Sequence, residues 1–84
     1  MIRVLFFAKL RENLGVESLD LGFDSDIQSI HDIIARIRDQ RGNDFADNIT
    51  ADGIVTALNH QIVKGNPPVN DGDEVAFFPP VSGG

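Results

Sequence analysis

The chain contains no cysteine among its 84 residues. This absence excludes disulfides, zinc sites built on thiolates and a cysteine nucleophile. Basic residues are scarce: 7 lysines and arginines stand against 13 aspartates and glutamates, which gives a net charge of −6. Because phosphate backbones repel an acidic surface, we do not expect nucleic acid to be a partner.

Long hydrophobic runs are absent as well. No segment approaches the roughly 20 apolar residues that span a bilayer, and the N-terminal residues do not resemble a signal peptide. We therefore expect a cytoplasmic protein without a membrane partner. The sequence has no glycine-rich phosphate loop, so ATP is not expected to bind this chain. His31 and His60 are far apart in sequence, and no metal site or bound cofactor is expected.

The length and the hydrophobic patterns predict one small domain that spans residues 1–84. The isoleucines of 27–37 recur at helical spacing and predict a helix from about Ile27 to Arg41, with Ser25 or Asp26 as N-cap. Residues 9–14 are expected to form a turn or a short helical connector, and residues 43–53 a polar loop. Segments rich in β-branched and aromatic residues, or with alternating polarity, predict strands at 2–8, 16–21, 54–58, 61–63 and 74–78.

The predicted order is β-β-α-β-β-β, with one helix covering one face of a mixed sheet of about five strands. This is a two-layer α+β solution. The order matches the β-grasp arrangement of ubiquitin-like proteins, in which the first and last strands lie side by side and parallel at the centre of the sheet.

The first and last strands carry more hydrophobic residues than one helix can cover. In the first strand, alternation puts Ile2, Val4 and Phe6 on one face, and Leu5 and Phe7 on the other. In the last strand it puts Val75 and Phe77 on one face, and Ala76 and Phe78 on the other. If the first set faces the helix, the open face of the sheet carries Leu5, Phe7 and Phe78. An exposed apolar patch of this kind usually marks a partner surface. The alternative is that residues 43–53, or the C-terminal tail, fold over the patch.

The C-terminal residues 79–84 predict a flexible tail. Pro79 and Pro80 cannot continue strand pairing and favour a stiff, extended exit. Beyond them come Val81, Ser82, Gly83 and Gly84. Two glycines make the narrowest peptide available, which a tunnel in a partner could admit. A carboxylate is a poor electrophile, so the Gly84 carboxylate would need activation, for example adenylation by a partner that uses ATP. The alternative is a frayed terminus without a role.

At this point the sequence resembles a known family, the small sulfur-carrier subunit of molybdopterin synthase. The resemblance covers nearly the whole chain. It is most specific in residues 71–84, which read DGDEVAFFPPVSGG, and it extends to IRVLFFA at residues 2–8 and to Arg11-Glu12. Members of that family are ubiquitin-like β-grasp proteins that carry sulfur covalently as a C-terminal thiocarboxylate.

The resemblance implies a sequence of events centred on Gly84. An activating enzyme adenylates its carboxylate, sulfur transfer gives the thiocarboxylate, and the tail inserts into the large subunit of the synthase. There sulfur passes to cyclic pyranopterin monophosphate. The resemblance also implies a complex of two large and two small subunits, with Phe7 and Phe78 at partner-contacting positions. Acid-base catalysis would belong to the large subunit, so this chain would not be an enzyme on its own.

Three other functions remain open from the sequence. The chain could be a ubiquitin-like modifier conjugated to lysines through Gly84, since some small archaeal modifiers have a similar ending. It could carry sulfur for a different product, such as thiazole or thiolated tRNA. It could also be a generic binding module, in which case the tail would be dispensable.

Overall fold

The computed structural model describes residues 1–80; Val81–Gly84 lie outside the described residues. The described part contains five strands and three helices. In chain order they are β1 (Ile2–Phe6), α1 (Ala8–Leu14), β2 (Ser18–Leu21), α2 (Ile30–Arg41), α3 (Asn43–Ile49), β3 (Val55–Leu58), β4 (Gln61–Val63) and β5 (Glu74–Phe78). None of the helices in residues 1–80 has the length and apolar character that crossing a membrane would require.

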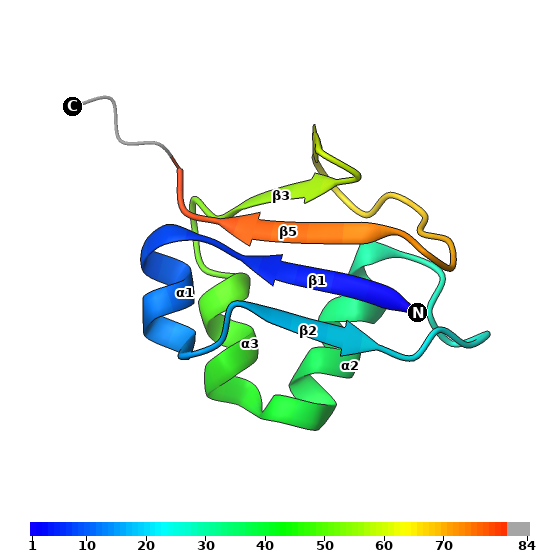
Figure 1. The fold of residues 1–84 in the computed structure, drawn as a ribbon, viewed down its shortest axis with the longest axis horizontal. Helices are drawn as coiled ribbons and strands as arrows, with labels where there is room; N and C mark the ends of the chain where they lie inside the picture. The colour runs from blue at the N-terminus through cyan, green and yellow to red at the C-terminus, as the bar shows by residue number, and fades with distance from the viewer. Residues whose placement is uncertain (81–84) are drawn as a thin grey trace.

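The strands form one sheet in the order β2-β1-β5-β3-β4 (Figure 1). The first and last strands, β1 and β5, are parallel neighbours, with Arg3 opposite Glu74 and Phe6 opposite Phe77. The β1–β2, β3–β5 and β3–β4 pairs are antiparallel. The predicted β-grasp sheet, including its central parallel pair, is confirmed.

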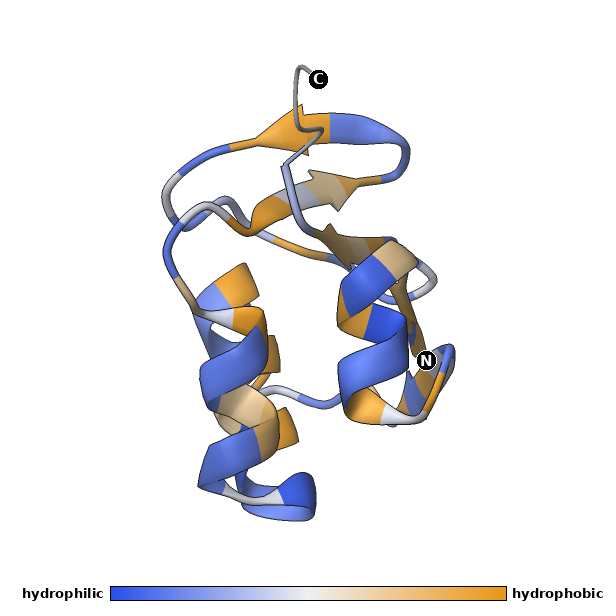
Figure 2. Ribbon diagram, turned by 90° about the vertical axis from the view of Figure 1, so that its left-hand side faces the viewer, coloured by the Kyte–Doolittle hydropathy of each residue, from blue (hydrophilic) through white to orange (hydrophobic). Residues whose placement is uncertain are grey.

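The helices cover one face of this sheet (Figures 1 and 2). The hydrophobic core lies between the two layers. The Phe6 ring stacks on Phe77, with centroids 6.2 Å apart, and meets the edge of Phe45 at 5.6 Å. The largest side chains that are less than 2% exposed come from the strands on one side, and from α2 and the residues just before it on the other: Ile2, Val4, Phe6, Leu21, Ile27, Ile33, Ile37, Val75 and Phe77. The alternation predicted for β1 and β5 is therefore correct.

One prediction about the helices is wrong, and a second, which left two alternatives open, is resolved. Residues 43–53 are not a loop throughout, because Asn43–Ile49 form the helix α3, which packs beside α2. For residues 9–14 the sequence left a turn or a short helical connector open, and the structure has the short helix α1 at residues 8–14. Both helices have seven residues and bury only one or two side chains each. Stripes this short give little periodic signal. The single-helix order therefore becomes β-α-β-α-α-β-β-β.

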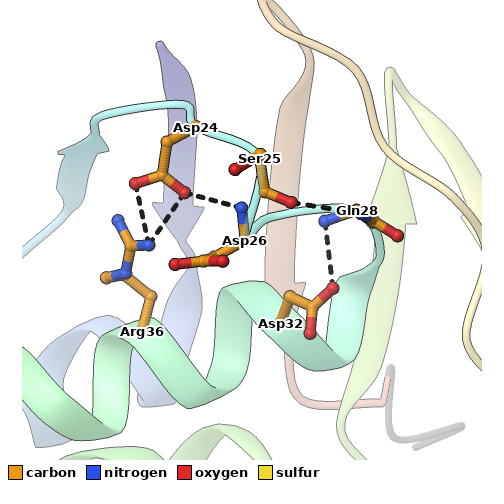
Figure 3. Close-up of polar contacts among 6 residues, drawn as sticks. All are labelled: Asp24, Ser25, Asp26, Gln28, Asp32 and Arg36. Atoms are coloured by element: carbon orange, nitrogen blue, oxygen red, sulfur yellow. Dashed lines mark hydrogen bonds and ion pairs between the residues drawn. The ribbon is translucent and has the colours of Figure 1, made fainter.

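The main helix begins three residues later than predicted. Its N-cap is Ser29, not Ser25 or Asp26. Asp32 reaches back to the start of the helix. Its carboxylate accepts a hydrogen bond from the Gln28 backbone N–H at 2.9 Å (Figure 3) and another from the Ser29 hydroxyl at 3.2 Å. Ile27 is 1% exposed although it precedes the helix. It is a core residue that happens to continue the spacing of the helical isoleucines, which explains why the sequence places the start of the helix too early.

The loop before α2 is fastened by Asp24 (Figure 3). Its carboxylate accepts a hydrogen bond from the Asp26 backbone N–H at 2.9 Å and two from the Arg36 guanidinium at 3.0 and 3.1 Å. The Asp26 N–H, and after it the Arg36 charge, lower the pKa of the Asp24 carboxyl below its usual value. This contact ties the loop that follows β2 to the second turn of α2.

Candidate functional site

The open face of the sheet, opposite the helices, contains a shallow apolar hollow of about 370 Å³. The three residues that the sequence assigns to a partner surface, Leu5, Phe7 and Phe78, all line it. Phe7 is 44% exposed, while Leu5 and Phe78 are partly buried. The remaining lining residues are Ala57, His60, Ile62, Glu74 and Ala76. The predicted patch is therefore a continuous surface drawn from four strands and their ends.

Strand register explains the shape of the hollow. Ala76 on β5 lies between Leu5 on β1 and Ala57 on β3, because both are its register partners. The two alanines are 9% and 7% exposed, and their short side chains form the floor. Larger neighbours stand around them. The central strands thus use small residues to create a recess that is bordered by aromatic and aliphatic side chains.

Ile62 is a border residue that the sequence reasoning missed. It lies opposite Ala57 in the β3–β4 pair and is 67% exposed. Its strand has only three residues, too few for alternation to reveal which face each side chain occupies. The exposure of Ile62 enlarges the apolar surface beyond the residues predicted from β1 and β5.

The hollow has one polar end, formed by the turn between β3 and β4. Asn59 and His60 both have positive φ, 50° and 71°, as a tight hairpin turn requires. The His60 Nε2 atom lies 3.3 Å from a Glu74 carboxylate oxygen. Asn59 fixes the turn against β5, because its side-chain oxygen accepts a hydrogen bond from the Glu74 N–H at 2.9 Å. A partner docking here would meet a mainly apolar surface with one acidic edge.

Residues 43–53 do not cover the hollow. Helix α3 packs on the opposite face, where Phe45 contacts Phe6, and the Arg41 guanidinium lies 5.8 Å from the Phe45 ring centroid. The sequence left open that residues 43–53, or the C-terminal tail, fold over the apolar patch. The first of these two alternatives is therefore wrong. The other alternative concerns the tail, whose last four residues lie outside the described part of the chain.

The chain leaves the sheet beside the hollow. β5 ends at Phe78, which lines the hollow and pairs with Val55 on β3. Pro79 is partly buried, and Pro80 packs next to Gly53 in the loop before β3. On the other side, the Phe7 N–H donates a hydrogen bond to the Phe77 carbonyl at 3.2 Å. The aromatic surface and the start of the tail are thus held together at the end of the central strand pair. Val81, Ser82, Gly83 and Gly84, the other predicted tail residues, lie outside the described residues.

Sequence comparison finds one matching family and several similar proteins. The model of the ThiS family matches residues 4–84. The molybdopterin synthase sulfur carrier subunit of Escherichia coli is 36% identical, and that of Haemophilus influenzae is 35% identical. Each of these two matches covers 100% of this chain and 100% of the relative.

Solved structures with similar folds come from two functional contexts. A complex of subunits 1 and 2 of molybdopterin-converting factor from Helicobacter pylori contains a chain that is 25% identical, with a TM-score of 0.65 and coverage of 99% and 97%. The small archaeal modifier protein 1 from Methanosarcina acetivorans is also 25% identical, with a TM-score of 0.72 and coverage of 99% and 95%.

Proposed function

Since the chain belongs to the ThiS family, we propose that it is the sulfur carrier subunit of a molybdopterin synthase and acts in molybdenum cofactor biosynthesis. The observation that carries the proposal is full-length identity above one third to two bacterial proteins of that name. The exposed aromatic hollow next to the chain exit supports it, because a carrier must bind partners and deliver its end to them in one geometry.

The proposed reacting group is the carboxylate of Gly84. An activating enzyme transfers AMP from ATP to this carboxylate and releases pyrophosphate, which gives a mixed anhydride. A sulfide donor then attacks the acyl carbon, AMP leaves, and the product is a thiocarboxylate. The anhydride makes carbon–sulfur bond formation favourable, since AMP is a much better leaving group than an oxide or hydroxide ion. ATP therefore belongs to the partner, and this chain carries only the covalently bound sulfur.

Delivery takes place in the large subunit of the synthase. We propose that the tail from Pro79 to Gly84 enters that subunit while the hollow around Leu5, Phe7 and Phe78 docks on its surface. The thiocarboxylate sulfur attacks a side-chain carbon of cyclic pyranopterin monophosphate, and the carbon–oxygen bond at that carbon breaks as the carbon–sulfur bond forms. Water then hydrolyses the acyl–sulfur bond, which leaves the sulfur on the pterin and regenerates the Gly84 carboxylate. A second thiocarboxylate supplies the second sulfur of the dithiolene in the same way. The proposed assembly contains two large and two small subunits, and its acid-base residues belong to the large one.

Intact-mass spectrometry after incubation with the activating enzyme, ATP and sulfide tests this proposal. The expected product is heavier by the difference between one sulfur and one oxygen atom, and it converts cyclic pyranopterin monophosphate to a dithiolene when the large subunit is added. The variant that lacks Gly84 should show neither change and should keep the thermal unfolding midpoint of the full chain. Unmodified mass in the full chain, or sulfur transfer by the truncated variant, would contradict the proposal.

The resemblance in fold to a small archaeal modifier protein favours a second candidate, conjugation to lysines through Gly84. The chemistry of the first step is the same, because an acyl-adenylate can be attacked by an amine as well as by sulfide. Affinity purification of the tagged chain from its own cells distinguishes the two. Isopeptide-linked conjugates on other proteins would support a modifier, whereas only the free chain and its thiocarboxylate would support a carrier.

A further inference from the structure

The loop between α3 and β3 contacts the chain where it leaves the sheet. The last residue pair of β3 and β5 is Val55 with Phe78. Gly53 and Pro80 each lie two residues beyond this pair, so the antiparallel register continues to hold them opposite one another. A Cβ atom built on Gly53 would lie 3.5 Å from Cγ and 3.7 Å from Cδ of Pro80. The chain therefore stays beside β3 and its loop for two residues after strand pairing ends.

Gly53 differs from the other described glycines in this contact. Its φ of +87° lies in the region that L-residues rarely adopt, and Gly72 has nearly the same φ, +91°. A Cβ atom on Gly72 would meet no atom within 4 Å, and the same is true of Gly15, Gly22, Gly42 and Gly65. Backbone conformation alone would explain a glycine at 53. The adjacent proline ring is a second and independent feature of this position, because a side chain added at 53 would touch the ring.

We infer that Gly53 is a positioning residue, which directs the C-terminal residues by giving the Pro80 ring a place beside a bare backbone. A methyl group at 53 would be in ordinary contact with the ring, so atoms beyond Cβ that extend toward Pro80 would collide with the ring and compete with it for this space. Because Pro80 has a fixed φ, displacement of its ring redirects the chain that follows. The inference rests on the proposed function, in which the Gly84 carboxylate must reach the active site of a partner.

Gly53→Asn tests the inference, with Gly72→Asn as the matched control. Asparagine tolerates positive φ better than most residues, and both substitutions carry a similar backbone strain. Only the first adds atoms next to Pro80. We would measure ATP–pyrophosphate exchange by the adenylating enzyme of the same organism, with each variant as the substrate. For Gly53→Asn we expect kcat to fall roughly 10- to 100-fold with little change in KM, because misplacement of a reacting group slows the reaction without weakening docking.

The outcomes that overturn the inference are distinct from failure of the proposed function. Equal kcat values for Gly53→Asn and Gly72→Asn would overturn it. So would full additivity in a double-mutant cycle with Pro80→Ala, because two residues that act through one contact are coupled. Should the wild-type chain give no exchange, the proposed function fails, and nuclear Overhauser effects between Gly53 Hα and the Pro80 ring protons still test the contact. Their absence in the wild-type protein would overturn the positioning role.

Discussion

Phe6 and Phe7 are neighbours in the sequence whose side chains lie on opposite faces of the sheet, so they form a matched pair for separating stability from docking. Phe6 is 1% exposed and packs between Phe77 and Phe45. Phe6→Ala removes a core ring and should destabilise the domain by about 3–5 kcal/mol. That is a large part of the roughly 5–15 kcal/mol that stabilises a typical domain.

Phe7→Ala should behave in the opposite way. Phe7 is 44% exposed, and a phenylalanine side chain buries roughly 150–250 Å² in full, so docking can remove about 70–110 Å² more from water. At about 25 cal/mol per Å², this area contributes about 2–3 kcal/mol to partner binding. Each 1.4 kcal/mol is about tenfold, so the Kd should rise roughly 15- to 100-fold. The free energy of unfolding should change by about 1 kcal/mol or less.

Urea unfolding of the isolated variants gives the stability of each, and isothermal titration calorimetry against the large subunit of the synthase gives the Kd for Phe7→Ala. Two results would refute the reasoning. One is a loss of stability in Phe7→Ala as large as that in Phe6→Ala, which would mean that Phe7 belongs to the core. The other is an unchanged Kd in a folded Phe7→Ala, which would mean that the hollow does not contact this partner.

Two further predictions concern polar contacts that stabilise the fold, one at Asp24 and one at Asn59. Asp24 has a lowered pKa in the folded chain, so its contribution to stability is complete above the usual carboxyl pKa, about 4, and is lost as the pH falls through the folded value. Thermal unfolding midpoints of Asp24→Asn and wild type should therefore converge as the pH is lowered from 7 toward about 2, and a constant difference would contradict the assignment. Asn59→Gly keeps the positive φ but removes the bonds to Glu74 N–H and to the Asp73 carboxylate, so urea unfolding should show a loss of about 1–3 kcal/mol. Asn59→Ala should lose more, since it adds backbone strain, and equal stability of the two variants would refute the role of φ.

The sequence predicts most of this sheet because each strand has its own signal. Alternation in β1 and β5 identifies which side chains face the helices, and the same alternation identifies the exposed set around Phe7. The prediction fails where a residue is buried for a reason outside its own element. Ile27 is covered by the core although it precedes α2, and this burial shifts the apparent start of the helix.

The rest of the site depends on pairing between distant segments. Ala57 and Ala76 are unremarkable in sequence, and only the β3–β5 register turns them into the floor of a hollow. Nothing in the sequence distinguishes Gly53, since a glycine in a polar stretch is a common turn residue. Its contact with Pro80 follows from the same register and has no local sequence signal.

The central place of β5 has a consequence for synthesis of the protein. Arg3, near the first residue, pairs with Glu74, so the middle of the sheet is missing until the last strand has emerged from the ribosome. A nascent chain interrupted before Glu74 leaves β1 and β3 without their shared neighbour and Phe6 without its stacking partner. Such a fragment cannot close the core and becomes a substrate for proteases. We therefore expect protein quality control in the cell to remove such incomplete chains, so that the surviving molecules extend at least to the point where the tail begins.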